Sequence, residues 1–464
     1  MPAPTPPTGP APAATPAAAA AALNPAELLR SRQYIVILLL SAIVGVPISL
    51  AAYGFIQLVD VIQTGLYDHL PHVFGYQSAP DWWAIPLLAV SGLAVGASIT
   101  YLPGTGGHSP ADGLQTGGPQ PIELFGVLAA AIAGLGLGIV LGPEAPLLAL
   151  GGGLGALAVH LAKRDAPPMA STVIAAAGSF AALGTIFGSP LIAAFFLMEA
   201  VGVGGQLLSL ILVPGLLASG IGAMVFIGMG RWTGLGSSTL SLPGLPAYPH
   251  PTFVQLLWAL AIGLVSAVLA TGIRRMGLYL RTFTAPRMLT LTPVAGVAVG
   301  VLALVFAVIT HKGITPVLFS GQSYLGTLVG HAATWSVGAL LVLMVCKGLA
   351  YGISLSSFRG GPVFPSLLLG AAIGLVFSHL PGMSIVPAIA AGIGGMGAAM
   401  LRLPLASAML AILLLAQDAL AVSPIVIVSV VAAYVLGAWI APKPADPPPA
   451  PSPATTPSPA PAGG

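Results

Sequence analysis

Charged residues are scarce in this sequence. Asp, Glu, Lys and Arg make up 5% of its 464 residues, and only 11 residues are acidic. Soluble domains carry about 25% charged residues, whereas this chain is 56% hydrophobic and has a mean hydropathy of +0.99. The composition therefore indicates an integral membrane protein that lies in a lipid bilayer. A net charge of +3 is too small and too dispersed to indicate a nucleic-acid partner.

Cysteine and metal-ligand patterns are also missing. The single Cys346 excludes an intrachain disulfide and a cysteine metal cluster, and its apolar surroundings favour a packed thiol. The eight histidines are scattered without ligand spacing. The sequence contains no nucleophile–base pair and no phosphate-binding loop. We therefore expect a protein that is not an enzyme and that holds no metal and no cofactor.

The two ends of the chain differ from its middle. Residues 1–26 are rich in proline and alanine, and residues 442–464 are rich in proline, alanine and serine. Such segments bury too little apolar surface to offset their ordering entropy, so we expect two disordered tails. Residues 27–441 are expected to form one helical membrane domain. Some of its apolar runs, such as Leu191–Ala200, are shorter than the about 20 residues that cross a bilayer, which predicts broken helices.

Glu144 is an acid placed deep in hydrophobic sequence. It lies in GPEAP (142–146), between the apolar runs Leu124–Leu141 and Leu147–Leu161. A carboxylate at the bilayer centre costs about 2.5–3.5 kcal/mol on insertion scales, so such a residue is expected to be functional. The surrounding glycine and prolines break the helix at this point. A broken helix at membrane depth is tolerated only where it is buried in protein or lines a water-filled cavity.

Two parts of the sequence resemble each other. PLLALGGGLG (146–155) matches PSLLLGAAIG (365–374), with glycines five and nine positions after each proline. Further along, SPLIAA (189–194) matches LPLASA (403–408). Two matches in the same order predict a duplicated fold, although the sequence alone leaves open whether the repeats are parallel or inverted. Interrupted segments at matching positions of two halves indicate a substrate site made of broken helices.

Three loops rich in glycine and proline lie at 104–113, 142–146 and 359–365. Glycine followed by proline is typical of helix starts. A helix start exposes unpaired backbone N–H groups and the positive end of the helix dipole. Several such starts converging inside a membrane would bind an anion, and would hold it weakly enough to release it.

The order of these loops, together with SPL (189–191) and RLPL (402–405), resembles the CLC family of chloride channels and chloride/proton antiporters. The resemblance covers about residues 34–440. It implies an all-α membrane protein built as an inverted repeat of tilted and broken transmembrane helices. It also implies a homodimer with one ion path per subunit, in a multi-pass protein of the cell membrane. The substrate would be chloride or a similar anion, with protons as a possible second substrate.

The resemblance also implies roles for single residues. Glu144 falls on the gating glutamate, whose carboxylate blocks the anion path and swings away when protonated or displaced. Gly107 stands where the family has an ion-coordinating serine. Ser109 either contacts the ion or only caps a helix that begins at Pro110. His108 either contacts the ion or makes a hydrogen bond within the loop.

The flanks of these motifs depart from the family pattern. Pro143 replaces a basic residue, and Ala145 replaces the glycine beside the gate. Pro362 stands where the family offers an N–H to the ion, but Val363 and Phe364 still carry amides, and Phe364 is equally well explained as a packing residue. The family's final tyrosine-bearing helix has no counterpart before residue 442. The expected anion-binding residues are Gly107, His108, Ser109, Ala145, Val363 and Phe364.

A second acid, Glu199, lies in a short apolar run on one helical face with Phe195. Coupled family members have two adjacent acids here, and the second transfers protons. This chain has Ala200 at that second position, which favours a channel slightly over an antiporter. Glu199 remains a possible proton relay, or a carboxylate paired at a wet interface. Fluoride or nitrate as the anion and a non-transporting scaffold are the alternatives, and the retained Pro146 argues against fluoride.

Basic and small residues predict orientation and assembly. Arg30, Arg32 and Lys443 flank the membrane region, and Arg274, Arg275, Arg281 and Arg287 are expected to fill one loop. The positive-inside rule then places both termini in the cytoplasm. Small residues in 201–205 and 215–230 would let helices approach closely, either inside one subunit or across a dimer contact.

Overall fold

The computed structural model describes residues 30–113, 118–162, 168–201, 206–234, 242, 245–415 and 418–441. Within these ranges every regular element is helical, apart from one isolated β-bridge. Among the described residues, eight helices are long and apolar enough to cross a membrane, and several shorter apolar helices lie between them. The prediction of an all-α membrane fold is thus confirmed. The two expected tails, 1–26 and 442–464, lie outside the described residues.

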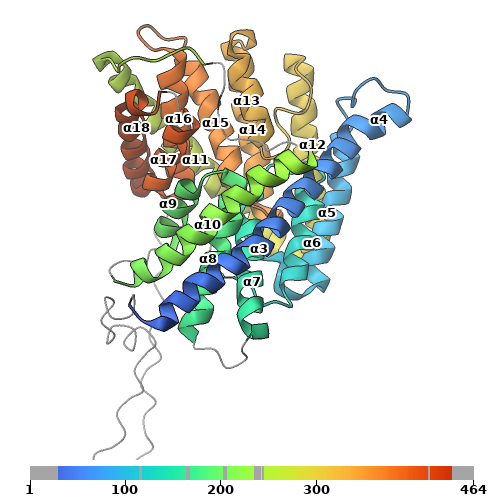
Figure 1. Ribbon diagram of the computed structural model, residues 1–464. Coiled ribbons are helices and arrows are strands. Elements are labelled where there is room, and N and C mark those ends of the chain that lie inside the picture. The colour runs from blue at the N-terminus through green and yellow to red at the C-terminus, as the bar shows by residue number, and fades with distance from the viewer. Residues whose placement is uncertain are drawn as a thin grey trace, which may run out of the picture.

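The first half of the chain contains long tilted helices and short broken ones (Figure 1). Its elements are α3 (Arg32–Thr64), η1 (Gly65–His69), α4 (Leu70–Val73), α5 (Ala84–Tyr101), η2 (Pro103–Gly106), η3 (Pro110–Asp112), α6 (Leu124–Leu135), α7 (Glu144–Ala162), α8 (Pro168–Phe187), α9 (Pro190–Val201) and α10 (Gln206–Thr233).

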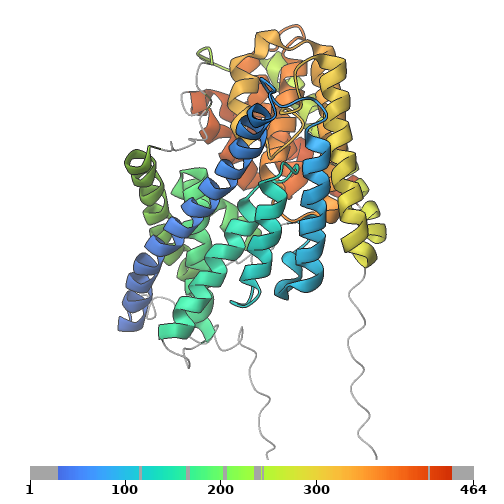
Figure 2. The same cartoon turned by 90° about the vertical axis from the view of Figure 1, so that its right-hand side faces the viewer.

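The second half repeats this alternation of long and short helices. Its elements are α11 (Phe253–Thr284), η4 (Ala285–Arg287), α12 (Met288–Thr310), α13 (Gln322–Gly330), η5 (Ala332–Thr334), α14 (Val337–Ser357), α15 (Val363–Phe377), α16 (Ile385–Leu401), α17 (Pro404–Leu414) and α18 (Ala419–Ile440). In Figure 2 the blue α3 leans across the molecule, whereas the lighter blue α5 stands more upright.

Helix packing follows the sequence repeat. α7 packs on α8 as α15 packs on α16, and α8 contacts α10 as α16 contacts α18. Gly151 of α7 lies against the carbonyl of Gly178, and Gly370 of α15 lies against the carbonyl of Gly392. A Cβ atom at either repeated glycine would collide with that backbone. The matched glycines therefore let the two helix pairs approach closely, which explains why their spacing recurs in the sequence.

The two repeats meet at one backbone bridge. Gly142 and Gly361 form an antiparallel pair in which each N–H donates to the other's carbonyl, at 2.7 and 2.6 Å. These glycines precede the starts of α7 and α15, which are equivalent helices. Equivalent segments that pair antiparallel are related by a local two-fold axis. The bridge is compatible with the inverted repeats that the family resemblance implies.

The prediction that four arginines fill one loop is wrong. Arg274, Arg275 and Arg281 lie within α11, which continues to Thr284, and Arg287 ends the short turn η4. The helix continues because no proline interrupts it before residue 286 and because arginine is a good helix former. The guanidinium of Arg275 donates to the carbonyl of Ile440, the last residue of α18. Arg275 thus satisfies a carbonyl at the C-terminal end of α18.

Small residues of α10 serve internal packing. Gly215 lies against the ring of Phe180, and Gly222 lies against the carbonyl of Ala181, both in α8. Gly220 and Gly228 have nothing within 4 Å of a Cβ position. Residues 202–205 lie outside the described ranges. Close internal approach therefore explains part of the small-residue pattern, and a dimer contact through the rest stays a prediction.

A buried lysine ties α14 to an irregular loop. The Lys347 side chain is fully buried, and its Nζ donates to the carbonyls of residues 316, 317, 318 and 319 at 3.0–3.3 Å. A buried loop must find partners for its backbone groups, and one ammonium group supplies several of them here. Lys347 is therefore a structural cation.

The Lys347→Met variant is expected to lose about 3–5 kcal/mol of stability, because the buried carbonyls of residues 316–318 lose their donor. The measurement is the thermal unfolding midpoint of the purified protein in detergent. Lys312→Met is the matched control, since that amine donates to only one carbonyl, that of Thr334, at 3.0 Å. Equal midpoints for the two variants would contradict the structural role of Lys347.

Candidate functional site

Glu144 is the first residue of α7, and its side chain is fully buried. Its Oε1 accepts a hydrogen bond from the backbone N–H of Val363, the first residue of α15. Its Oε2 has no hydrogen-bond partner among the described residues. The carboxyl group lies where Cβ atoms of Gly142 and Gly361 would otherwise stand. The carboxylate therefore occupies a space that two glycines leave open between the repeats, and we call this space the seat.

The seat is suited to negative charge. The helices α7 and α15 both begin at it, and each helix start carries roughly half a positive charge from its aligned peptide dipoles. Free backbone N–H groups at helix starts bind anions well. The predicted convergence of helix starts on Glu144 is thus present for two of the three glycine–proline loops. The side chain of Glu144 supplies the anion that the seat now holds.

A buried tyrosine supports the second helix start. The Tyr351 hydroxyl donates to the carbonyl of Pro362 at 2.7 Å, and the Tyr351 side chain is fully buried in α14. The bond fixes the turn just before α15 and thus the amide of Val363. We made no prediction for Tyr351. A tyrosine shortly before a glycine–proline loop is a weak signal, because only the folded backbone brings its hydroxyl to that loop.

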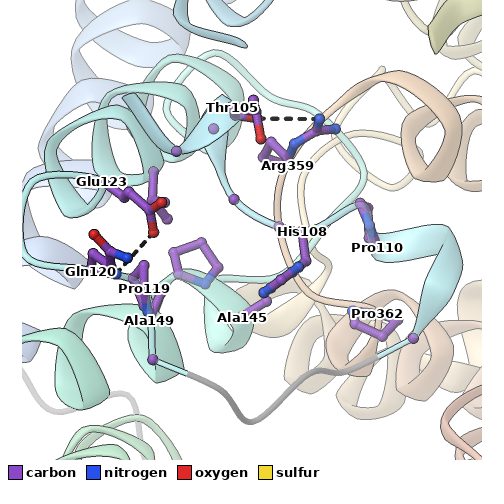
Figure 3. A pocket seen from close by; sticks show the side chains of 18 residues that line it. Thr105, His108, Pro110, Pro119, Gln120, Glu123, Ala145, Ala149, Arg359 and Pro362 are labelled. Atoms are coloured by element: carbon purple, nitrogen blue, oxygen red, sulfur yellow. Dashed lines mark hydrogen bonds between the residues drawn. The ribbon is translucent and has the colours of Figure 1, made fainter. Parts of the chain in front are cut away.

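A cavity of about 590 Å³ adjoins the seat. Figure 3 shows the side chains that line this cavity. It is lined by the first glycine–proline loop, by the first turn of α7 and by the loop before α15. A smaller cavity of about 110 Å³ is lined by Leu141 and Pro143, together with Asp60 and residues at the start of α13. The two cavities share no lining residue. Their nearest residues along the chain, Pro143 and Ala145, stand on either side of Glu144.

The two cavities lie toward opposite faces of the molecule. The Trp83 indole donates to the carbonyl of Leu66, so the end of α3 lies beside the start of α5. The smaller cavity includes Gln63 at the end of α3. The larger cavity includes Gly104, which follows the other end of α5. Glu144 therefore lies between a cavity on one face and a cavity on the other.

The first loop holds two of its three predicted residues at the larger cavity. Gly107 lines it with a left-handed φ of 88°, and His108 also lines it, with its ring on the side where Ala145 lies. Ser109 is buried, its hydroxyl has no partner among the described residues, and it does not line the cavity. Capping by Ser109 is wrong, because only the three-residue turn η3 follows before Gly113 turns the chain with φ 93°.

The two predicted residues of the third loop have different roles. The amide of Val363 contacts the Glu144 carboxylate, as described above. The side chain of Phe364 is buried, and its ring centroid lies 6.0 Å from that of Phe187. Packing therefore accounts for the Phe364 ring. Pro362 lines the larger cavity, and Ala145 lines it from the first turn of α7.

Glu199 caps a neighbouring helix. Its two carboxylate oxygens accept from the backbone N–H groups of Leu405 and Ala406, at 3.0 and 2.7 Å. These residues form the first turn of α17, which otherwise has no side-chain cap. A carboxylate at a helix N-terminus is stabilised by free N–H groups and by the helix dipole. This contact explains why an acid lies in a short apolar helix, and the explanation does not require a role in proton transfer.

Arg359 is a cavity residue for which we made no separate prediction. Its side chain is 7% exposed and lines the larger cavity. One terminal nitrogen donates to the carbonyl of Phe358 at 3.2 Å, and the other to that of Thr105 at 3.4 Å (Figure 3). Burial lowers the pKa of Arg359 to about 10, so the guanidinium is charged at neutral pH. Its place in the third loop could have drawn attention to it.

The fold and site define a multi-pass helical membrane protein whose inverted repeats present helix starts to a buried carboxylate. The family model described as "Voltage gated chloride channel" matches residues 112–437, which is more than half of the chain. The chain therefore belongs to this CLC family of anion-transport proteins. The eight long apolar helices found in the described part of the chain agree with that membership.

Relatives and solved structures agree with the family. YfeO of Escherichia fergusonii, named as an inferred ion-transport protein, is 28% identical over 379 residues, covering 79% of this chain and 85% of YfeO. A slow cyanobacterial Cl⁻/H⁺ antiporter superposes with a TM-score of 0.72 at 17% identity, covering 88% of this chain and 95% of the antiporter. A CLC-type fluoride/proton antiporter gives 0.64 at 18% identity, covering 87% and 95%. At these identities the structures show a shared fold.

Proposed function

We propose that this protein lets small monovalent anions, chloride foremost, cross the cell membrane along a path that Glu144 closes. The observation that carries the proposal is the position of the Glu144 carboxylate, which fills a seat at two helix starts between two cavities. A carboxylate and a halide compete for the same N–H groups, so one must leave when the other binds. The gate opens when the carboxylate leaves the seat.

The larger cavity would bring the anion to the seat. Gly107, His108 and Ala145 line it, and the Val363 amide contacts Glu144 in the adjoining seat. Backbone amides and helix dipoles bind an anion without a full charge, so the anion can leave again. Ser109 stays a proposed contact only through movement of the loop, since its hydroxyl does not line the cavity. Phe364 would contribute its amide while its ring packs.

We favour a channel over a proton-coupled antiporter. Two of the solved relatives are named as proton antiporters, and that coupling belongs to those proteins. Here Ala200 occupies the second position of the acid pair, and both oxygens of Glu199 are held by backbone N–H groups. An antiporter in which Glu199 relays protons is the alternative.

The deciding experiment measures the reversal potential of chloride current through protein reconstituted in liposomes. A channel gives a potential set by the chloride gradient alone, and an imposed pH gradient leaves it unchanged. The Glu199→Gln variant is expected to conduct like the wild type but to unfold more easily by about 1–2 kcal/mol, because one capping contact is weakened. A reversal potential that moves with the pH gradient, and stops moving in Glu199→Gln, would establish the antiporter.

The same preparation tests the remaining alternatives. Replacing chloride by fluoride or nitrate gives the selectivity order, and the retained Pro146 leads us to expect fluoride last. A protein without flux, both as wild type and as Glu144→Ala, would be a scaffold that kept the fold. The proposed homodimer is tested by the mass of the purified protein in detergent. Labelling of cysteines introduced at the two chain ends tests the proposed cytoplasmic location of both termini.

A further inference from the structure

The guanidinium of Arg359 is a buried cation in the wall of the larger cavity, and some of its N–H donors have no partner among the described residues. Its side chain is 7% exposed. Its two terminal nitrogens each donate to one backbone carbonyl, those of Phe358 and Thr105. Its Nε has no partner among the described residues. A guanidinium has five N–H donors in a rigid fork, so donors remain for a further ligand.

Two acids lie near the cavity, and each makes another contact. Asp112 pairs with Arg281, and Glu123, which lines the cavity, accepts from the backbone N–H of Gln120 at 2.9 Å. In the part of the chain that the structure describes, Arg359 forms no ion pair. A buried charge without a partner is costly, since carbonyl dipoles replace only part of its hydration. An anion in the cavity would supply the ion pair that the described residues do not give Arg359.

The position of Arg359 ties it to the seat. It precedes Gly361, which bridges to Gly142, and Val363, whose amide contacts Glu144. Gly360 and Pro362, its close neighbours in the chain, line the same cavity. An anion held at Arg359 would therefore wait in the cavity that adjoins the seat. Helix starts alone carry only partial charges, whereas this residue carries a full one.

We propose that Arg359 forms a second anion-binding site, which captures small monovalent anions in the larger cavity before they reach the Glu144 seat. The proposal rests on the proposed function as an anion path. It deepens that function by naming the residue that sets the affinity for anions on one face. The guanidinium binds halides by charge, and its planar fork also suits a planar oxyanion such as nitrate.

The test compares anion flux into liposomes as a function of anion concentration for wild type, Arg359→Gln and Arg359→Lys. Arg359→Gln is expected to raise the half-saturating chloride concentration by about tenfold, the usual range for a lost charge-assisted hydrogen bond, while the maximal flux changes little. Arg359→Lys is expected to recover the chloride value but not the nitrate value, because an ammonium group lacks the fork. Arg275→Gln removes a charge on the same face outside the cavity lining and is expected to behave like the wild type.

An unchanged half-saturating chloride concentration in Arg359→Gln would overturn the proposal, and so would an equal rise in Arg275→Gln. If the wild type carries no flux, the proposed function fails, but the site is still testable. Calorimetric titration of the purified protein with sodium nitrate then supports the site if binding disappears in Arg359→Gln, and overturns it if binding is unchanged. If Arg359→Gln does not elute as a folded protein, the nitrate-to-chloride ratio of Arg359→Lys decides, and a wild-type ratio overturns the proposal.

Discussion

Glu144→Ala is expected to raise chloride flux about 10- to 100-fold, because the variant removes the anion that competes for the seat. The Glu144 carboxylate is held by a hydrogen bond from the Val363 amide and by two helix starts. Hydrogen bonds to charged groups contribute about 1.5–3 kcal/mol. This free energy corresponds to a change of about 10- to 100-fold in the fraction of molecules whose gate is open. Flux through the wild type should increase on acidification, since a protonated carboxyl is held less strongly. Flux through the variant should not respond to pH in the same range.

The measurement is chloride efflux from liposomes at matched protein content. Glu144→Gln keeps the shape of the side chain without its charge and should lie between the wild type and Glu144→Ala. Glu199→Ala is the matched control, because it removes a partly buried acid that also contacts backbone amides at a helix start, but away from the seat. A decrease of flux in Glu144→Ala would show that the carboxylate assists passage and is not a gate.

Local signals made the central part of the site predictable. Glu144 is an acid flanked by glycine and proline, and these residues both break the helix and open space beside it. The glycines five positions after Pro146 and Pro365 fit close helix packing, so the repeat was visible in the sequence. These features depend on residues that are neighbours along the chain. The inverted arrangement was implied only by the family resemblance, and the bridge marks where the two repeats meet.

Features that depend on tertiary proximity were not predictable. The partners of Glu199 lie on another helix, more than 200 positions away, at sequence separations of 206 and 207. The Thr105 carbonyl that contacts Arg359 is 254 positions distant. Ser109 before proline has the sequence of a helix cap, but the chain turns away at Gly113 before a helix can form. The local sequence can indicate a helix start, but whether a helix follows depends on the tertiary structure.

Gly361→Ala is expected to reduce flux by about tenfold or more, because its methyl group would fill the seat. A Cβ atom at this position would overlap the Glu144 carboxyl group. Overpacking a dense site costs about 1–3 kcal/mol, which corresponds to roughly 5- to 150-fold in occupancy. The backbone bridge to Gly142 uses only main-chain atoms, so it survives the substitution. The measurement is again chloride efflux from liposomes.

The double variant Gly361→Ala/Glu144→Ala separates the seat from the gate. If the anion passes through the seat, the methyl group still obstructs it after the carboxylate is gone, and flux stays well below that of Glu144→Ala alone. Gly437→Ala is the control, since nothing lies within 4 Å of its Cβ position. A double variant that conducts like Glu144→Ala would place the anion path elsewhere, because an added methyl group would then have no effect on passage. Glu144→Ala empties the seat, whereas Gly361→Ala fills it. The methyl group therefore limits the flux of the double variant only if the anion passes through the seat.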